Sequence, residues 1–228
     1  MEVFYLLILS IFGQFCDKIG MLRVHALGLS YHDKALLLTM PPGRGNSTMA
    51  LSMLQEENVM LISDDAPLFD TFGYILPLPL HIGFLDKNSI EFVPDEYIYS
   101  IDRMEFGPKY FVDYDYWKDR LEKRPLKDVV LFIAHRVLNG SPSIEKASKR
   151  KAFASLLRDA VIGIGLYQGL EFILNSSVWE ILSKIPTIFK RLILALKLIR
   201  ISKTYRFTLS RNIEENTRLF KEFIQKLP

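Results

Sequence analysis

Alternating apolar and polar segments divide the first half of the chain into short strands. Residues 22–27 and 35–39 are apolar runs on either side of the turn-like segment 30–34, so they predict a pair of strands. Residues 58–63 predict another buried strand, and the run at 48–54 predicts a helix that precedes it. Further short strands are predicted at 73–77, 90–93, 109–112 and 129–133. This half is therefore expected to be rich in β-structure.

The spacing of apolar residues becomes helical from residue 143 onward. The expected helices span residues 144–163, 167–174 and 178–201. Pro186 is expected to kink or divide the last of these, because proline lacks the backbone N–H that a helix interior uses. Residues 205–209 predict a returning strand, and Asn212 with Glu215 predicts a capping box at the start of a final helix.

Length and composition place the chain among ordinary globular proteins. It has 228 residues, of which 49% are hydrophobic and 24% charged, which is enough for one large domain. We therefore predict a single α/β domain over residues 1–228, in which helices flank a mixed β-sheet. Its β-rich part covers residues 1–142, and its mainly helical part covers residues 143–228.

The single cysteine and the N-terminal apolar run bear on where the protein resides. Cys16 has no second thiol with which to form a disulfide or a cysteine-based zinc site, so it indicates a reducing compartment, most simply the cytoplasm. Residues 3–12 are apolar, but the run is too short to span a bilayer and has no basic residue ahead of it. We interpret this run as a core-facing helix, and we expect no stable membrane insertion.

Charge is distributed unevenly along the chain. Residues 143–228 hold 16 Lys and Arg against 7 Asp and Glu, or +9, whereas residues 1–142 hold 13 against 19, or −6, which together give the net +3. A basic half could contact nucleic acid, an anionic membrane or an acidic partner. Its charges recur at helical spacing among Leu and Ile, however, as solvated helix faces do. We favour that interpretation and expect no nucleic-acid partner.

A strand that leads into a degenerate phosphate-binding loop is the main chemical signal. In the pattern G-x-x-x-x-G-K-[ST], glycines let backbone N–H groups surround phosphate oxygens, the lysine neutralises phosphate charge, and the hydroxyl holds Mg²⁺. Met40 occupies the position of the first glycine and Asn46 that of the lysine, whereas Gly45, Ser47 and Thr48 remain in register. The following helix would favour an anion at its N-terminus. The candidate nucleotide-binding residues are Gly43, Arg44, Gly45, Asn46, Ser47 and Thr48.

Two adjacent carboxylates are the second chemical signal. Asp64 and Asp65 follow the apolar strand at 58–63, about a dozen residues beyond the loop helix, where an acidic group can reach Mg²⁺ or the attacking nucleophile. Two carboxylates can divide these tasks, since one can hold metal while the other accepts a proton. Residues 63–67 could instead be a polar turn, which Asp and Pro favour. With the loop upstream, we favour a site.

The order of these segments resembles the catalytic domain of the HPr kinase/phosphorylase family. The resemblance covers roughly residues 20–85 and runs from Val24-His25-Ala26 through the loop to Asp64-Asp65 and then to 73–79. It implies a P-loop domain of the HPr kinase/PEP carboxykinase-like type, which uses ATP and Mg²⁺ to phosphorylate a serine or another hydroxyl group. The implied acceptor is a protein, a peptide or a small molecule, and a homo-oligomer is left open.

The resemblance also implies a role for each matching residue. His25 would assist near the reacting group, and Asp64 would be the base. Ser47 and Asp65 would bind the Mg²⁺ ion. Together these give His25, Asp64 and Asp65 as catalytic candidates, and Ser47 and Asp65 as metal ligands.

The replaced lysine leaves two functions open. Asn46 cannot supply the missing cation, and losing a group that neutralises transition-state charge costs about 10²–10³-fold in rate. Arg44 or a basic residue of the C-terminal half could replace that charge. The first hypothesis is an ATP-dependent kinase of a serine or other hydroxyl, impaired to some degree. The second is a catalytically inactive relative that acts as a nucleotide-sensing or protein-interaction module.

Other candidates are weaker. His32, His81 and His135 have no second ligand at metal-site spacing. The aromatic cluster at 110–117 could stack on a base, but its acidic residues would repel phosphate, so we predict core packing. The basic and apolar segment 188–201 could lie on an anionic membrane, although packing against the sheet is the favoured use of its apolar face.

Overall fold

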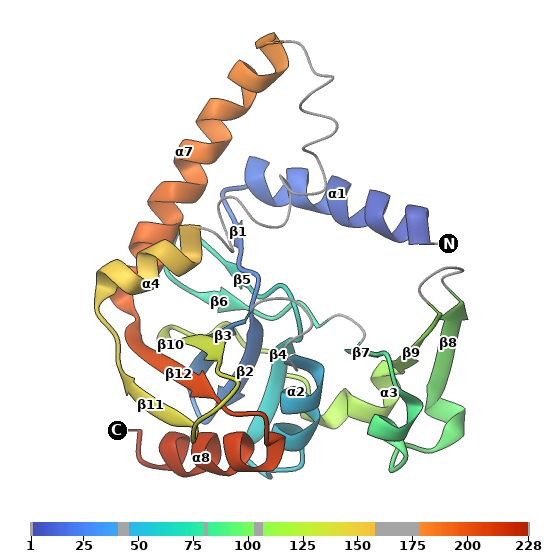
Figure 1. Ribbon diagram of the computed structural model, residues 1–228. Coiled ribbons are helices and arrows are strands. Elements are labelled where there is room, and N and C mark those ends of the chain that lie inside the picture. Colours follow the sequence, from blue (N-terminus) through green and yellow to red (C-terminus); the bar gives the residue numbers. More distant parts are fainter. Residues whose placement is uncertain (1, 41–45, 80–81, 103–106, 158–177, 228) are drawn as a thin grey trace.

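The computed structural model describes residues 2–40, 46–79, 82–102, 107–157 and 178–227. It has a mixed α/β fold, with helices on both sides of a six-stranded sheet (Figure 1). The strand order in this sheet is β11 (Ser143–Lys146), β12 (Lys203–Leu209), β10 (Asp128–Arg136), β3 (Lys34–Thr39), β2 (Leu27–Tyr31) and β4 (Val59–Ser63). The expectation of a mixed sheet with flanking helices is confirmed.

Strand direction determines which loops meet. Strands β3, β10 and β12 are parallel, whereas β2 is antiparallel to both of its neighbours, β3 and β4. Strands β3 and β4 therefore run in the same direction and end at the same edge of the sheet. Strand β2 begins at that edge, because it runs the opposite way. The segments after β3, after β4 and before β2 are thus brought to one place by topology alone.

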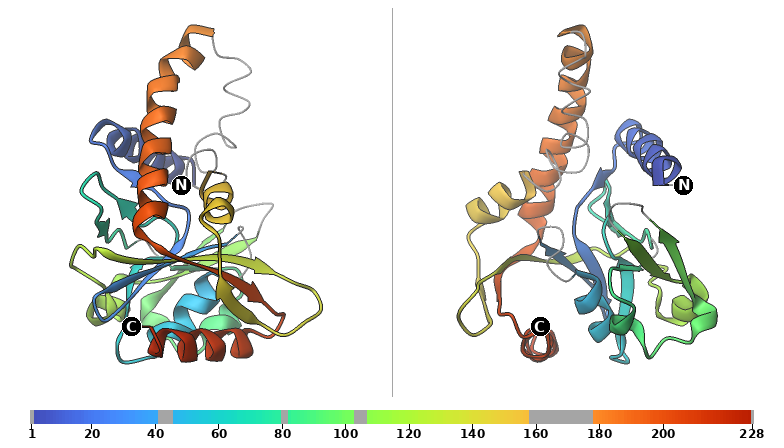
Figure 2. Two further views of the ribbon diagram at one scale, coloured as in Figure 1. Left: turned by 90° about the vertical axis from the view of Figure 1, so that its left-hand side faces the viewer. Right: turned by 45° about the vertical axis from the view of Figure 1, so that its right-hand side comes forward.

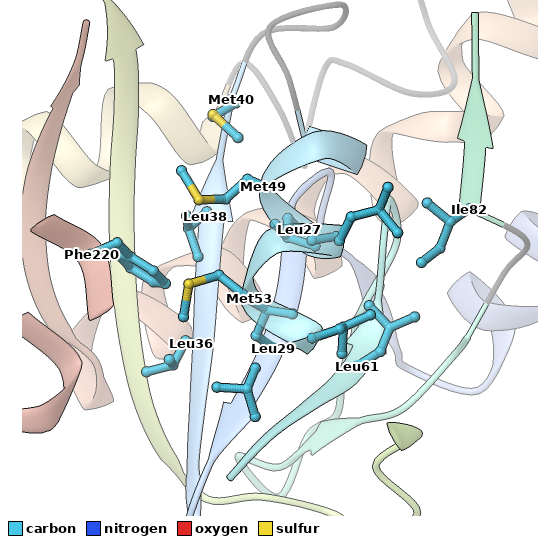
Figure 3. Packing of buried hydrophobic residues seen from close by; sticks show 14 of the residues in the cluster. Leu27, Leu29, Leu36, Leu38, Met40, Met49, Met53, Leu61, Ile82 and Phe220 are labelled. Atoms are coloured by element: carbon cyan, nitrogen blue, oxygen red, sulfur yellow. The ribbon is translucent and has the colours of Figure 1, made fainter. Parts of the chain in front are cut away.

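Residues 35–38 of strand β3 are all apolar because the sheet is covered on both faces. Leu36 and Leu38 belong to one core cluster, and Ala35 and Leu37 belong to the other. The first cluster includes residues of α2 (Asn46–Leu54) and α8 (Ile213–Gln225), and the second includes residues of α4 (Lys149–Leu156) and α7 (Val178–Ile201). Figure 3 shows the first cluster from close by.

Two smaller sheets and an N-terminal helix complete the fold. One sheet has the order β1 (Leu22–Arg23), β5 (Leu68–Phe69) and β6 (Ile75–Leu76), and the other has the order β7 (Ile82–Phe84), β9 (Pro108–Val112) and β8 (Ile98–Asp102). Helix α1 (Glu2–Lys18) contacts β1 and α7. Short helical turns lie at Lys87–Ile90, Asp95–Tyr97, α3 (Tyr114–Trp117) and Lys118–Arg120.

Most of the predicted strands are present. The strand and helix predicted around the loop are confirmed as β4 and α2, and β9, β10 and β12 match predicted strands. The first hairpin differs: residues 22–27 do not form one strand, because β1 ends at Arg23 in another sheet and β2 spans Leu27–Tyr31. The turn lies at His32 and Asp33, with His32 at φ 53°. Asn212 caps α8 as expected, and its side chain accepts hydrogen bonds from the backbone N–H groups of Glu214 and Glu215.

Several predictions of local structure were wrong. Residues 90–93 form no strand, because Ile90 ends a 3₁₀ turn. Ser143–Lys146 is strand β11 and not part of a helix, because it pairs antiparallel with β12. Helix α7 runs through Pro186 without dividing. The helix predicted at 167–174 lies outside the described residues.

The N-terminal helix is present, but the core-facing orientation predicted for it is wrong in part. Ile8 and Ile11 are 62% and 58% exposed. Cys16, on an adjoining face of the same helix, is buried, and α1 contacts β1 and α7.

Candidate functional site

Topology brings the three predicted catalytic residues to one edge of the main sheet. Asp64 and Asp65 directly follow the last residue of β4, Ser63. His25 lies just before β2, whose first residue, Leu27, pairs with Leu38 near the end of β3. Because β2 is antiparallel to β4, the start of β2 and the end of β4 lie side by side. The sequence order of these residues gives no such proximity.

Backbone hydrogen bonds hold His25 opposite Asp65. The N–H of Val24 donates to the carbonyl of Pro67 at 3.0 Å, and the N–H of Ala26 donates to the carbonyl of Asp65 at 3.1 Å. These two bonds flank His25, and its Nδ1 atom lies 2.7 Å from Oδ1 of Asp65. The His25 side chain is 17% exposed and that of Asp65 is 47% exposed, so the pair lies at the surface end of a partly buried site.

A compact turn places the two carboxylates. The Oγ atom of Ser63 accepts a hydrogen bond from the N–H of Ala66 at 3.0 Å, which closes the chain around Asp64 and Asp65. Gly28 lies opposite this turn, and a Cβ atom there would come within 3.2 Å of the Cβ atoms of Ile62 and Pro67. The register of β2 against β4 shifts at this glycine. A side chain at this position would push the turn away from the sheet.

Asp64 is the electrostatically unusual member of the site. Its Oδ1 atom is buried and has no hydrogen-bond partner in the part of the chain that the structure describes. Burial, followed by the neighbouring Asp65 carboxylate, raises the pKa of Asp64 to about 8, whereas the charges of Lys109 and His25 act in the opposite direction. A carboxyl group with such a pKa exchanges its proton near neutral pH, which suits a general base.

Lys109, whose charge acts to lower the pKa of Asp64, was not a candidate in the sequence. It lies on β9, and its side chain extends over Gly83 of β7, where an added Cβ atom would come within 2.5 Å of its Cε. Its Nζ atom lies 5.2 Å from the centre of the Phe111 ring. Strand alternation places Lys109 and Phe111 on the same face of β9. Nothing in the sequence, however, linked this strand to Asp64.

The phosphate-binding loop is described in part. Gly43, Arg44 and Gly45 lie outside the described residues, whereas Asn46, Ser47 and Thr48 form the first turn of α2. Ser47 and Thr48 are half-buried.

Met40, which replaces the first glycine of the loop pattern, is only 1% exposed and belongs to the core cluster together with Met49 (Figure 3). Its side chain thus packs in the core. The hydrophobic burial of Met40 therefore anchors the end of β3.

The candidate metal ligands are oxygen atoms, which Mg²⁺ prefers, but they are too few to form a complete metal site. Among the described residues, no group of three or more His, Cys, Asp or Glu side chains could hold a metal ion. Mg²⁺ is commonly held by one or two protein oxygens together with substrate phosphates, so the Ser47 hydroxyl and the Asp65 carboxylate are of the right chemical type.

The other predicted candidates do not join this site. His32 stacks edge-on against Tyr31, with ring centroids 4.3 Å apart, His135 is exposed, and His81 lies outside the described residues. Trp117 is buried in the first core cluster and Tyr116 packs against it, which confirms core packing for this end of the aromatic segment. Phe111 instead faces the other way and stacks on Tyr99, with ring centroids 5.5 Å apart.

A small pocket of about 40 Å³ lies at the same edge of the sheet, next to the end of β3. This volume is small beside the roughly 300–1,000 Å³ of typical ligand pockets. It is lined by Met40, Met49, Arg136, Leu209, Ser210, Ile213 and Asn216.

Comparison with known proteins leaves the fold and the site as the basis for assigning function. No protein-family model matches the chain, and no curated protein matches it either. The class that the structure defines is a mixed α/β protein with a His, a carboxylate pair and the start of a helix gathered toward one sheet edge.

Proposed function

We propose that this protein is a P-loop phosphotransferase of the HPr kinase/PEP carboxykinase-like type. It would bind Mg²⁺-ATP between β3 and α2 and transfer a phosphoryl group to a hydroxyl group of a protein, a peptide or a small molecule. The observation that carries the proposal is the 2.7 Å contact of His25 Nδ1 with Asp65 Oδ1 at the edge where β3 and β4 both end. Asp64 beside this pair supports the proposal, because its Oδ1 atom is buried and has no hydrogen-bond partner among the described residues.

Each side chain then has a chemical task. Asp64 accepts the proton of the attacking hydroxyl, for which its raised pKa is suited. Asp65 and the Ser47 hydroxyl would hold Mg²⁺, which would neutralise charge on the phosphates. His25 fixes the orientation of the Asp65 carboxylate, because the short contact restricts its rotation. The N-terminus of α2 offers backbone N–H groups to phosphate oxygens.

Lys109 supplies the cation that Asn46 lacks in this proposal. Its charge already acts on Asp64, and it belongs to β9, whereas the sequence suggested a basic residue of the loop or of the C-terminal half. A lysine acts on phosphate as a point charge, so its direction of approach matters less than its distance. Because Gly83 has no Cβ atom, it leaves the space that the Lys109 side chain occupies.

The alternative is a catalytically inactive protein that senses nucleotide or binds a partner. Asn46 favours it, because a loop without its lysine loses much of its transition-state stabilisation while the backbone cradle can persist. The two functions share one fold, but only the phosphotransferase would transfer phosphate from ATP.

Nucleotide binding is tested by thermal unfolding of the full chain with and without Mg²⁺-ATP. A ligand present at about 100 times its Kd, and bound only to the folded state, adds about 2.7 kcal/mol of stability. We expect a rise in Tm that is lost in Ser47→Ala and kept in Ser52→Ala. Ser52 is a matched control, since it lies on the same helix and its hydroxyl donates to the carbonyl of Thr48.

Turnover is tested by transfer of the γ-phosphate to serine-containing peptides and small alcohols. We expect Asp64→Asn to abolish transfer while the ATP-dependent rise in Tm remains. A rise in Tm that appears only after Asn46→Lys would support the inactive alternative. No rise in either protein would overturn the proposed nucleotide site.

A further inference from the structure

Helices α1 and α7 present a surface that the proposed activity does not use. Both lie on the side of the molecule away from α8, and α7 extends well beyond the sheets (Figure 2). They are joined by a two-point ion pair, in which Nε and Nη2 of Arg191 lie 2.7 Å from the two carboxylate oxygens of Asp17. Both side chains of this pair are less than one-fifth exposed. The two helices therefore form one connected unit.

Helix α7 has two distinct apolar faces. Leu194, Ala195, Leu198 and Ile199 are at most 6% exposed and pack in the second core cluster. A separate stripe with spacings of four, four and three residues faces solvent, as expected for one side of a helix. Its members are Ile185, Phe189, Ile193 and Leu196, with exposures of 44%, 62%, 60% and 49%. The predicted packing of this segment is therefore correct for only one of the two faces.

Helix α1 carries a matching apolar stripe. Its members are Ile8, Ile11 and Phe15, with exposures of 62%, 58% and 53%, and Ile19, directly after the helix, continues it with an exposure of 45%. Their spacings of three, four and four residues again define one side of a helix, and the buried Cys16 lies beside this stripe on an adjoining face. Isolated exposed apolar residues are normal on protein surfaces, but contiguous apolar stripes mark sites of interaction.

The charges around these stripes are basic. Lys18 on α1 and Lys190 and Arg200 on α7 are exposed. Within residues 11–20 and 185–201, whose side chains are described, the sole acidic residue is Asp17, and it is paired with Arg191. A second copy that docked through the same two helices would bring like charges together. A surface that is both apolar and negatively charged is the better complement.

We propose that α1 and α7 bind the surface of an anionic lipid bilayer. The apolar stripes enter the headgroup region, and Lys18, Lys190 and Arg200 contact acidic headgroups. The helices lie along the membrane and do not cross it: among the described helices, none combines the length and apolarity that spanning would need. Apolar area combined with basic residues on a helix is the usual basis of such interfacial binding. This inference does not rest on the proposed phosphotransferase activity.

The test is sedimentation of the full chain with vesicles of phosphatidylcholine that contain about 30 mol% phosphatidylserine. We expect binding that falls at least about tenfold with pure phosphatidylcholine, and that weakens as salt screens the headgroups. The double variant Phe189→Ser/Ile193→Ser should lose binding. Leu138→Ser is the matched control, because Leu138 is 69% exposed but lies after β10, outside both helices.

A charge variant tests whether the basic residues recognise acidic headgroups or whether the apolar stripes alone account for vesicle binding. Lys190→Glu/Arg200→Glu leaves the apolar stripes intact, so it should lose the preference for phosphatidylserine. Circular dichroism and Tm of each variant show that the chain still folds. Absence of binding to the anionic vesicles would overturn the proposal. So would a concentration-dependent dimer in light scattering that Phe189→Ser/Ile193→Ser abolishes without any vesicle binding, because the stripes would then join two copies.

Discussion

The Nδ1 atom of His25 lies 2.7 Å from Oδ1 of Asp65, although 40 positions separate the two residues in the chain. The contact depends on the antiparallel pairing of β2 with β4 and on the backbone bonds on either side of His25. If the pair acts as a unit in phosphoryl transfer, its two members cannot contribute independently.

A double-mutant cycle tests this coupling. We expect His25→Ala and Asp65→Asn each to lower the transfer rate by about 10²-fold, and the double variant to be little worse than either alone. His135→Ala serves as the control, since His135 is exposed at the end of β10. Fully additive losses would show that the contact has no role in the reaction.

The buried Asp64 carboxyl should make stability depend on pH. Its pKa is raised to about 8 in the folded protein from an ordinary 3.8, so the folded state holds this proton more tightly than the unfolded state. The stabilising effect is present at low pH and is lost as pH rises through about 8. We expect Asp64→Asn, which mimics the protonated group, to raise Tm at about pH 9 and to change it little at about pH 4. The measurement is thermal unfolding in EDTA, and an equal change at both pH values would contradict it.

Lys109 should matter for turnover more than for binding. Lys109→Met removes the charge but keeps most of the apolar stem, and we expect the transfer rate to fall about 10²–10³-fold while the ATP-dependent rise in Tm stays. Lys109→Arg should recover part of the rate. Lys87→Met is the control, because Lys87 pairs with Asp95 on the exposed surface at 2.9 Å. An unchanged rate in Lys109→Met would mean that the cation comes from elsewhere.

Glu122 should stabilise the fold through a buried carboxylate. It is 3% exposed, and it accepts hydrogen bonds from Ser30 Oγ at 2.9 Å and from the backbone N–H groups of Lys123 and Arg124 at 3.0 Å. Burial alone would raise the pKa of Glu122, but hydrogen bonds from Arg124 and Ser30 outweigh burial and lower it. Its contribution is therefore present above the pKa of the unfolded chain and is lost as pH falls through the folded pKa.

Replacing Glu122 tests this contribution. We expect Glu122→Gln to lower the free energy of unfolding by about 2–4 kcal/mol at neutral pH, because the amide NH₂ faces donors that then lack an acceptor. Urea unfolding at neutral and acidic pH is the measurement, and the loss should shrink in acid. Glu91→Gln, at an exposed position, should change stability little.

The sequence predicted the elements whose patterns are governed by local chemistry. The strand at Val59–Ser63, the loop helix and the Asn212 cap were predictable because burial on both faces, helix-start residues and capping act over a few residues. The strand β11 was not predictable, because four residues at a sheet edge carry too short an alternation and β11 depends on pairing with β12.

The sequence by itself determined the order of three features. A buried strand comes first, a phosphate-loop pattern without its lysine follows, and a second strand that ends in two carboxylates comes last. It also determined the apolar run at residues 3–12 and the helical apolar spacing at 178–201. Only the tertiary structure decided that His25 contacts Asp65, that Lys109 acts on Asp64, and that Met40 lies in the core. It also decided which face of α7 stays exposed. These are consequences of strand order and direction, and contacts between distant strands leave no local pattern in the chain.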